Sequence, residues 1–305
     1  TKAISLDIRS GPLELVTAEL YPWIASLEGL RHQLQDIKRV QGQIDVSALK
    51  FSGTIDNPLE GKYTATGKVQ DLSIETTLFP STISFARGGV TVNPQQLSFT
   101  QLHTATQDAA IVLTGNIKGF PQQLNRVTLT LDGDMGPKSV KWLADKLELP
   151  ETYAIRSPLG ISGAQISWQP QSTVSFKGTV AVDKGPKIIA DVGYQQKLLQ
   201  VRQLTIKDQY SDANLVFDIK NDQNDFRFSG KLQEETLQNL FIKNPVSGGQ
   251  LQGNLGVIVP RNRTTRIVAE GKLTGENVPI PLPSGDNVDI NQITLQADGS
   301  DIRAD

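Results

Sequence analysis

Residues 213–232 read ANLVFDIKNDQNDFRFSGKL, and this stretch decides the fold class. Apolar and polar side chains alternate on either side of KNDQND at 220–225, and a period of two places the apolar set on one face of a β-strand. The Asn and Asp residues between the two runs tolerate turn dihedrals. The stretch therefore predicts two antiparallel strands joined by a hairpin turn, with one face apolar and the other in water.

The same alternation extends over most of the 305 residues. No long helical crossover separates the alternating runs, so we expect antiparallel pairing rather than a parallel α/β sheet. The chain is therefore predicted to be mainly β, with one long antiparallel sheet. The clearest further runs are 51 FSGTI, 63 YTATGKV, 110 AIVLTGNI, 127 VTLTL, 174 VSFKGTVAV, 251 LQGNLGVIV and 267 IVAEGKL.

Three segments follow a helical period instead. Residues 12–38 carry apolar side chains at steps of three and four, with Pro22 expected to kink or split the helix. The other two segments are PKSVKWLADKL at 137–147 and QEETLQNLF at 233–241. We expect about three short amphipathic helices, with Trp23 of the first helix burying apolar area against the sheet.

The helical segments begin roughly 100 residues apart and each precedes a strand-rich block, which predicts an internal repeat. Short matches support the repeat: 204 LTIKDQYSD and 293 ITLQADGSD share an apolar-Thr-apolar start and a later Ser-Asp pair. We expect one continuous elongated domain that ends inside a larger array. Its predicted parts are a first strand and amphipathic helix at 1–39, a first β repeat at 40–135, a helix and second repeat at 136–231, and a short helix with a truncated third repeat at 232–305.

Glycine recurs in the register of the apolar residues, so it shares a face with them. An interior strand Gly marks a bulge, a sharp bend or the close approach of another group. One interpretation is a long sheet curled about its apolar face, with the glycines allowing curvature or leaving room along that face. The other is a sandwich or barrel whose corners require Gly. The glycines are Gly53, Gly67, Gly115, Gly178, Gly230, Gly253 and Gly271.

The predicted helices are too few to cover the apolar face of more than a dozen strands. A sheet with one apolar face buries it against a second layer or against a ligand, and an acyl chain gains about 0.8 kcal/mol for each buried CH₂ group. We therefore expect a groove that holds phospholipid or another acyl-chain lipid. The predicted lining residues are Phe51, Ile55, Val69, Leu113, Ile117, Phe176, Val180, Phe228, Leu255, Val257 and Leu273.

The composition, net charge and motifs of the chain exclude several classes of function. The chain has no Cys and only two His, which excludes thiolate catalysis, disulfides and multi-histidine metal sites. A net charge of −2 provides no overall basic field for nucleic acid. Nucleotide-binding, serine-hydrolase and zinc-protease motifs do not occur. We expect no enzyme activity, no cofactor, no metal and no nucleic-acid partner.

One basic cluster, 260 PRNRTTR, lies between two predicted strands. Arg261, Arg263 and Arg266 are candidate contacts for lipid head groups, because a guanidinium matches the geometry of a phosphate. The alternative is a solvated hairpin.

Several phrases resemble a known family. The phrases are AIVLTGNI, VSFKGTVAV and FRFSGKL, the strand starts at Asp108-Ala109 and Asp212-Ala213, and 271 GKLTGENVPIPLP. They are similar to the AsmA-like repeats of the AsmA and TamB group of Gram-negative envelope proteins. The opening 10 SGPLELVTAELYPWIASL also resembles the helix before such a repeat. The resemblance implies a bridge-like lipid-transfer protein whose antiparallel strands form a taco-like groove for phospholipid. It also implies a periplasmic location, anchorage to the inner membrane in the full-length protein, and transfer between inner and outer membranes through parts absent from this chain.

Two other interpretations stay open. In the first, the chain is a structural or protein-interaction β-solenoid or sandwich of the cell envelope with no lipid cargo, which docks through its first helix or a sheet edge. In the second, it is a polysaccharide-acting β-solenoid enzyme, for which we would expect clustered carboxylates and stacked aromatic residues on one face.

Overall fold

The computed structural model describes residues 3–8, 13–26, 34–54, 60–120, 123–170, 173–195, 198–243, 249–261, 266–281 and 287–305. The strands form one 18-stranded antiparallel sheet, and the described segments include three α-helices. The prediction of a mainly β chain with a long antiparallel sheet and short helices is confirmed. The chain divides into two compact units, residues 1–139 with 165–171 and residues 140–164 with 172–305.

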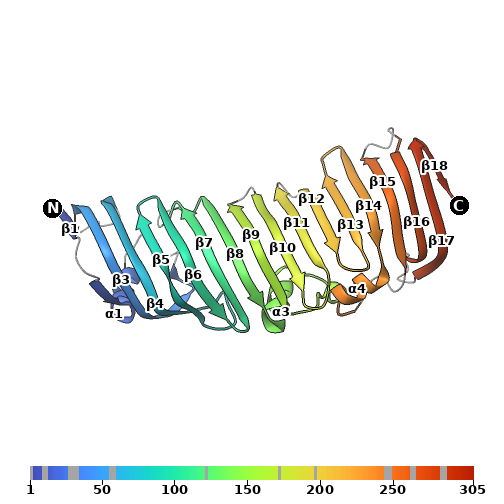
Figure 1. Ribbon diagram of the computed structural model, residues 1–305. Helices are drawn as coiled ribbons and strands as arrows, with labels where there is room; N and C mark the ends of the chain where they lie inside the picture. The colour runs from blue at the N-terminus through green and yellow to red at the C-terminus, as the bar shows by residue number, and fades with distance from the viewer. Residues whose placement is uncertain are drawn as a thin grey trace. The chain divides into compact units, whose positions relative to one another are not determined.

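In the first unit, strands that follow one another in the sequence pair with each other from β3 to β8 (Figure 1). Helix α1, Thr17–Ser26, contacts β3. The short strands β1 and β2 both pair with β3. The strands are β1 (Ala3–Ile8), β2 (Leu13–Val16), β3 (Ile37–Thr54), β4 (Lys62–Thr76), β5 (Ile83–Asn93), β6 (Gln96–Thr106), β7 (Ala109–Lys118) and β8 (Arg126–Met135).

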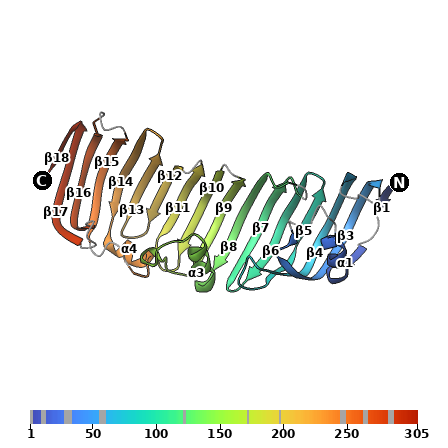
Figure 2. The same ribbon diagram turned by 180° about the vertical axis from the view of Figure 1, so that it is seen from behind.

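Helix α3, Pro137–Lys146, and strand β9, Leu159–Gln169, each contribute residues to both units. In the second unit, pairing again follows sequence order from β10 to β18, and Figure 2 shows the same strands from behind. A 3₁₀ turn at Glu151–Tyr153 and helix α4, Glu234–Leu240, complete this unit. Its strands are β10 (Thr173–Val182), β11 (Lys187–Gln195), β12 (Leu198–Lys207), β13 (Asp212–Ile219), β14 (Gln223–Leu232), β15 (Gln250–Pro260), β16 (Val268–Pro281), β17 (Asn287–Gly299) and β18 (Asp301–Ala304).

The hairpin predicted at 213–232 forms as β13 and β14. Phe217 lies opposite Phe226, and Leu215 lies opposite Phe228. The backbone N–H of Lys220 donates to the carbonyl of Gln223 at 2.8 Å, which closes the turn. The period-two pattern therefore predicted both the pairing and the face of these side chains.

The predicted helix at 12–38 is wrong at both ends. Residues 13–16 form β2, which pairs with Gln43–Val46 of β3, and Ile37 already belongs to β3. Pairing with the edge of β3 satisfies backbone groups of 13–16 and outweighs the local helical period. Trp23 is 55% exposed, so the expectation that it buries its ring against the sheet is also wrong. The predicted helices at 137–147 and 233–241 are confirmed as α3 and α4.

β-bulges interrupt the ladders of the first unit. They shift the register between β3 and β4, between β5 and β6, and between β6 and β7. Asp71 in β4 and Gln101 in β6 have positive φ angles of 45° and 49° at these irregularities. Bulges bend a strand and increase its twist, so the sheet of this unit is locally bent and not flat.

Candidate functional site

The strand register of the first unit brings the predicted lining residues to one face. Phe51 lies opposite Tyr63 of β4, and Val69 lies six residues after Tyr63 on the same side of that strand. Leu113 and Ile117 are four apart in β7 and therefore share a face as well. The same face continues from β4 across β5 and β6 to β7, because the strands are paired in that order. Val90 of β5 and Phe99 of β6 lie opposite each other on this face.

The second unit has the same arrangement. Phe228 lies opposite Leu215 and Leu255, and Val257 lies opposite Phe226. Three further predicted lining residues lie on the same face. In the ladders, Phe176 lies opposite Val192, Val180 lies opposite Ile188, and Leu273 lies opposite Gly253. Within each unit the described lining residues therefore lie on one side of the sheet. Ile55, the remaining predicted lining residue, lies outside the described residues.

Burial on the apolar face of the first unit is greatest in its middle. Val69 is 3% exposed and forms a buried cluster with Leu72 and Leu102, against which Leu113 packs. Phe51 and Ile117 are only partly buried. Water or another molecule therefore has access to the margin of this face.

In the second unit the helices cover one margin of the apolar face. Leu240 of α4 packs with Leu159 and Val182 in a buried cluster, which also contacts Val180 and Ile188 at that end of β10 and β11. The opposite margin is uncovered within the described residues. Its exposed side chains are Val174 (45%), Tyr194 (49%), Phe226 (36%) and Val259 (38%).

The predicted curvature glycines lie on the same apolar face. Gly230 and Gly253 have φ angles of 108° and 145°, which side-chain-bearing residues rarely adopt. A Cβ atom on Gly253 would lie 2.1 Å from the carbonyl oxygen of Lys272 in the neighbouring strand, and one on Gly230 would lie 2.1 Å from that of Asp212. The space that a side chain would take is therefore occupied by adjacent backbone, which fits strand bending rather than vacant room for a ligand.

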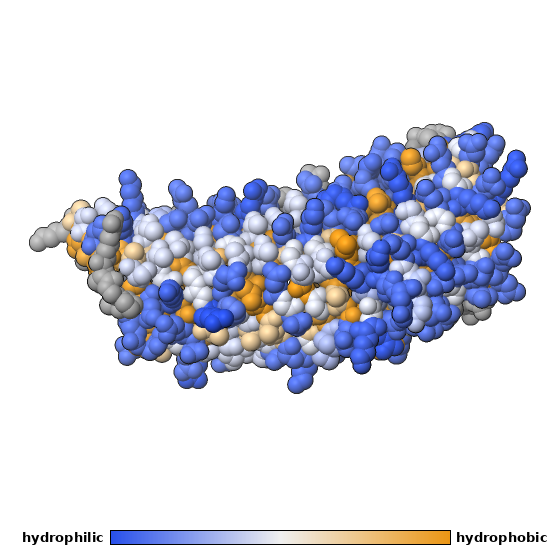
Figure 3. All heavy atoms as spheres, viewed as in Figure 1, coloured by the Kyte–Doolittle hydropathy of each residue, from blue (hydrophilic) through white to orange (hydrophobic). Residues whose placement is uncertain are grey.

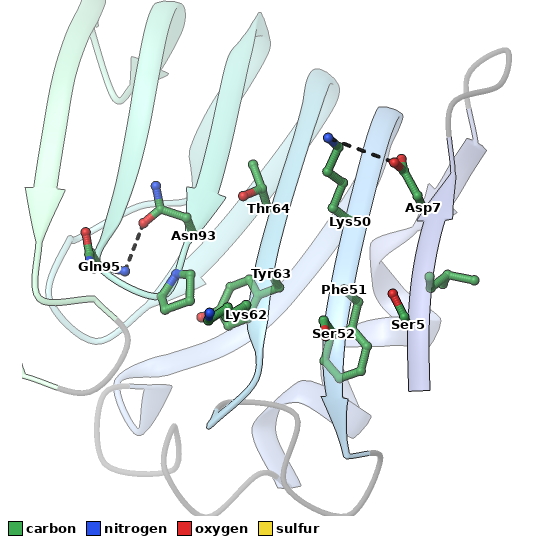
Figure 4. A pocket seen from close by; sticks show the side chains of 12 residues that line it. Ser5, Asp7, Lys50, Phe51, Ser52, Lys62, Tyr63, Thr64, Asn93 and Gln95 are labelled. Atoms are coloured by element: carbon green, nitrogen blue, oxygen red, sulfur yellow. Dashed lines mark hydrogen bonds and ion pairs between the residues drawn. The ribbon is translucent and has the colours of Figure 1, made fainter. Parts of the chain in front are cut away.

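A shallow pocket of about 620 Å³ lies at β1, β3 and β4 of the first unit, beside the turn between β5 and β6 (Figure 4). Lys50 and Asp7 form an ion pair at 3.9 Å across the pocket wall. Burial raises the pKa of the Tyr63 hydroxyl, so this group stays a neutral hydrogen-bond donor at physiological pH. The lining residues are Ser5, Leu6, Asp7, Lys50, Phe51, Ser52, Lys62, Tyr63, Thr64, Asn93, Pro94 and Gln95.

The basic cluster is described only in part. Arg261 and Arg266 are both exposed, and the backbone N–H of Arg261 donates to the carbonyl of Asp222 at 2.8 Å. Arg263 lies outside the described residues.

Figure 3 shows hydrophobic residues scattered between polar ones on the face turned to the viewer.

Within the described residues, no group of three or more His, Asp or Glu side chains is placed to hold a metal ion. No helix in the described part of the chain is long and apolar enough to cross a membrane.

Comparisons of the chain with protein-family models, with curated proteins and with solved structures find no match.

Proposed function

We propose that the chain binds acyl chains of phospholipid along the apolar face of its sheet, as a non-enzymatic segment of a periplasmic lipid-transfer protein that serves the inner and outer membranes. The observation that carries the proposal is the apolar margin of the second unit that no described residue covers. Val174, Tyr194, Phe226 and Val259 lie on the same face as the buried Phe228 and Leu255, yet remain more than one-third exposed. Large apolar side chains that stay exposed on the same face of a sheet are a feature of interaction sites.

An acyl chain suits this surface in energy and in shape. Burying ten methylene groups would contribute about 8 kcal/mol, at roughly 0.8 kcal/mol for each group. A flexible apolar chain needs no directional partner, so a row of aliphatic and aromatic side chains is sufficient to hold it. The resemblance to AsmA-like repeats supports phospholipid as the cargo, transport across the periplasm as the role, and inner-membrane anchorage of the full-length protein.

The experiment is native mass spectrometry of the purified chain, with extraction and quantification of bound lipid. Phe226→Asp places a charge on the exposed part of the apolar face, and we expect it to reduce co-purified phospholipid several-fold. Val216→Asp is the matched control, because Val216 lies opposite Arg227 on the other face of the same hairpin. It should retain wild-type loading.

Leu113→Asp and Val180→Asp extend the test to the first unit and to the covered margin. Val112→Asp is the control for Leu113→Asp, because Val112 is the adjacent residue and faces the other way. Far-ultraviolet circular dichroism checks that each variant is folded. A lipid-free wild-type chain, or equal lipid loss in the variants of both faces, would contradict the proposal and favour the protein-interaction alternative.

A further inference from the structure

A second cavity, of about 320 Å³, lies in the second unit between the end of α4 and the turn from β10 to β11. None of its lining residues is a strand residue of the apolar face, and none of the sequence patterns indicated it. Its lining residues are Arg156, Ser157, Asp183, Lys184, Asn239 and Ile242. We propose that this cavity binds a phosphate group.

The charge of the lining favours an anion. Arg156 and Lys184 contribute two positive charges, and Asp183 contributes one negative charge. Arg156 and Lys184 come from different segments, so two cations converge on one small space. A guanidinium and an ammonium together are the usual partners of a phosphate in proteins.

Arg156 is held in place by two hydrogen bonds to the end of α4. Its backbone N–H donates to the carbonyl of Leu240 at 2.8 Å, and its Nε donates to the carbonyl of Gln238 at 2.7 Å. These bonds also satisfy carbonyl groups that would repel an anion at a helix C-terminus. The Nη groups of Arg156 have no partner within the described part of the chain, so they remain available as donors.

The opposite wall is also fixed. Two backbone hydrogen bonds close the turn that contains Lys184. The N–H of Val182 donates to the carbonyl of Pro186 at 3.1 Å, and the N–H of Gly185 donates to the carbonyl of Val182 at 3.0 Å. A Cβ atom on Gly185 would lie 2.8 Å from the carbonyl oxygen of Asn239, so this turn lies against α4. The backbone of both walls is therefore held in place, so the turn that carries Lys184 need not be ordered when a ligand binds, which lowers the entropic cost of binding.

Ser157 and Asn239 supply a hydroxyl and an amide, both of which donate to phosphate oxygens. Ile242 lines the same cavity and is 57% exposed. Tyr153, which contacts the neighbouring Phe241 edge-to-face, is 52% exposed. The phosphate could thus belong to a lipid head group, whose apolar part would contact these two side chains, or to a soluble phosphate ester.

The experiment measures binding of two probes to the full chain. The soluble probe is sn-glycerol 3-phosphate, followed by isothermal titration calorimetry. The membrane probe is a vesicle of phosphatidylcholine containing phosphatidylglycerol, compared with phosphatidylcholine alone in a flotation assay. Binding of the soluble probe alone assigns the site to a free phosphate ester, and additional phosphatidylglycerol-dependent flotation assigns it to a lipid head group.

Three variants test whether binding occurs in this cavity. Lys184→Asn removes one cation and keeps a residue type that tolerates the positive φ of 54° at this position. We expect it to weaken binding about tenfold, the effect of losing one charge-assisted hydrogen bond. Asp183→Asn should strengthen binding, because it removes the one negative charge of the lining. Lys187→Asn is the control, because Lys187 is an exposed cation nearby that does not line the cavity.

The proposal is supported when Lys184→Asn weakens binding and Lys187→Asn leaves it unchanged. Equal effects of these two variants, or no binding of either probe at millimolar concentration, would overturn it. This outcome is independent of the proposed function, because the apolar-face variant Phe226→Asp should not change binding of sn-glycerol 3-phosphate.

Discussion

Asp108 and Ser139 are 31 residues apart and are joined by two hydrogen bonds. The backbone N–H of Ser139 donates to Asp108 Oδ1 at 2.9 Å, and its hydroxyl donates to the same oxygen at 2.7 Å. The backbone N–H of Lys138 donates to Oδ2 at 2.8 Å. The carboxylate of the turn before β7 therefore caps the first turn of α3, which follows β8.

The second unit repeats this arrangement. The hydroxyl of Thr236 in α4 donates to Asp208 Oδ1 at 2.9 Å, and the backbone N–H of Gln233 donates to Ser211 Oγ at 2.8 Å. Asp208 and Ser211 lie in the turn before β13, and α4 follows β14. In both units a helix thus returns to the turn two strands earlier, which is the structural form of the repeat that the sequence indicated.

We predict that the Asp108 carboxylate stabilises the fold in a pH-dependent way. The hydroxyl of Ser139, followed by the backbone groups of 138 and 139, holds the pKa of Asp108 below its ordinary value. A lowered pKa in the folded state means that the stabilisation is present above the unfolded-state pKa, and is lost as pH falls through the folded-state pKa. Asp108→Asn should melt at a lower temperature than wild type at pH 7, and the gap should close toward pH 3.

Thermal unfolding followed by circular dichroism at both pH values checks this prediction. Asp134→Asn is the control, because Asp134 is an exposed carboxylate near the end of β8. A melting-temperature difference for Asp108→Asn that stays constant from pH 7 to pH 3 would contradict the assignment.

We predict that Thr236→Val destabilises the chain by about 1–3 kcal/mol, the cost of leaving buried polar groups without a partner. Thr236 is completely buried, and its hydroxyl bonds both Asp208 and Ser211. Valine keeps the shape but removes the hydroxyl. Chemical denaturation measures the change, with Thr100→Val at an exposed strand position as the control. Equal stability of the two variants would show that the network contributes nothing.

We predict that alanine is poorly tolerated at Gly253 and well tolerated at Gly256, three residues later in β15. A Cβ at Gly256 would contact only the Arg227 side chain, at 3.7 Å, whereas at Gly253 it would collide with the backbone of β16. Gly253→Ala should therefore cost at least about 2 kcal/mol through backbone strain and displacement of the neighbouring strand. Denaturant titration of the two variants tests this difference. A Gly253→Ala variant as stable as Gly256→Ala would remove the argument for glycine-dependent bending.

The sequence predicted what depends on short-range periodicity. Alternation in 213–232 was sufficient for the hairpin and its register, because a slip of one residue would turn Phe226 and Phe228 to the other face. The register of Gly253 with Leu255 likewise indicated a position on the apolar face. The helical spacing of apolar side chains at 137–147 likewise predicted α3.

Features that depend on distant partners were missed. Leu13–Val16 carries a helical pattern, yet pairs with β3 because an edge was available there. Arg156 and Lys184 are single charges in segments without a motif, and only the packing of α4 beside the β10–β11 turn brings them to one cavity. The caps at Asp108 and Asp208 each bridge about 30 residues, a separation at which no local pattern operates.

The most direct test of the apolar-face proposal is photocrosslinking to bound lipid. A photoreactive amino acid is placed in turn at Phe226, Arg227, Val257 and Ile258, and the chain is purified, irradiated and analysed for covalent phospholipid by mass spectrometry. We predict acyl-chain adducts at 226 and 257, which lie opposite each other on the apolar face, and none at 227 and 258 on the other face. Adducts of equal yield at all four positions, or at none, would contradict it.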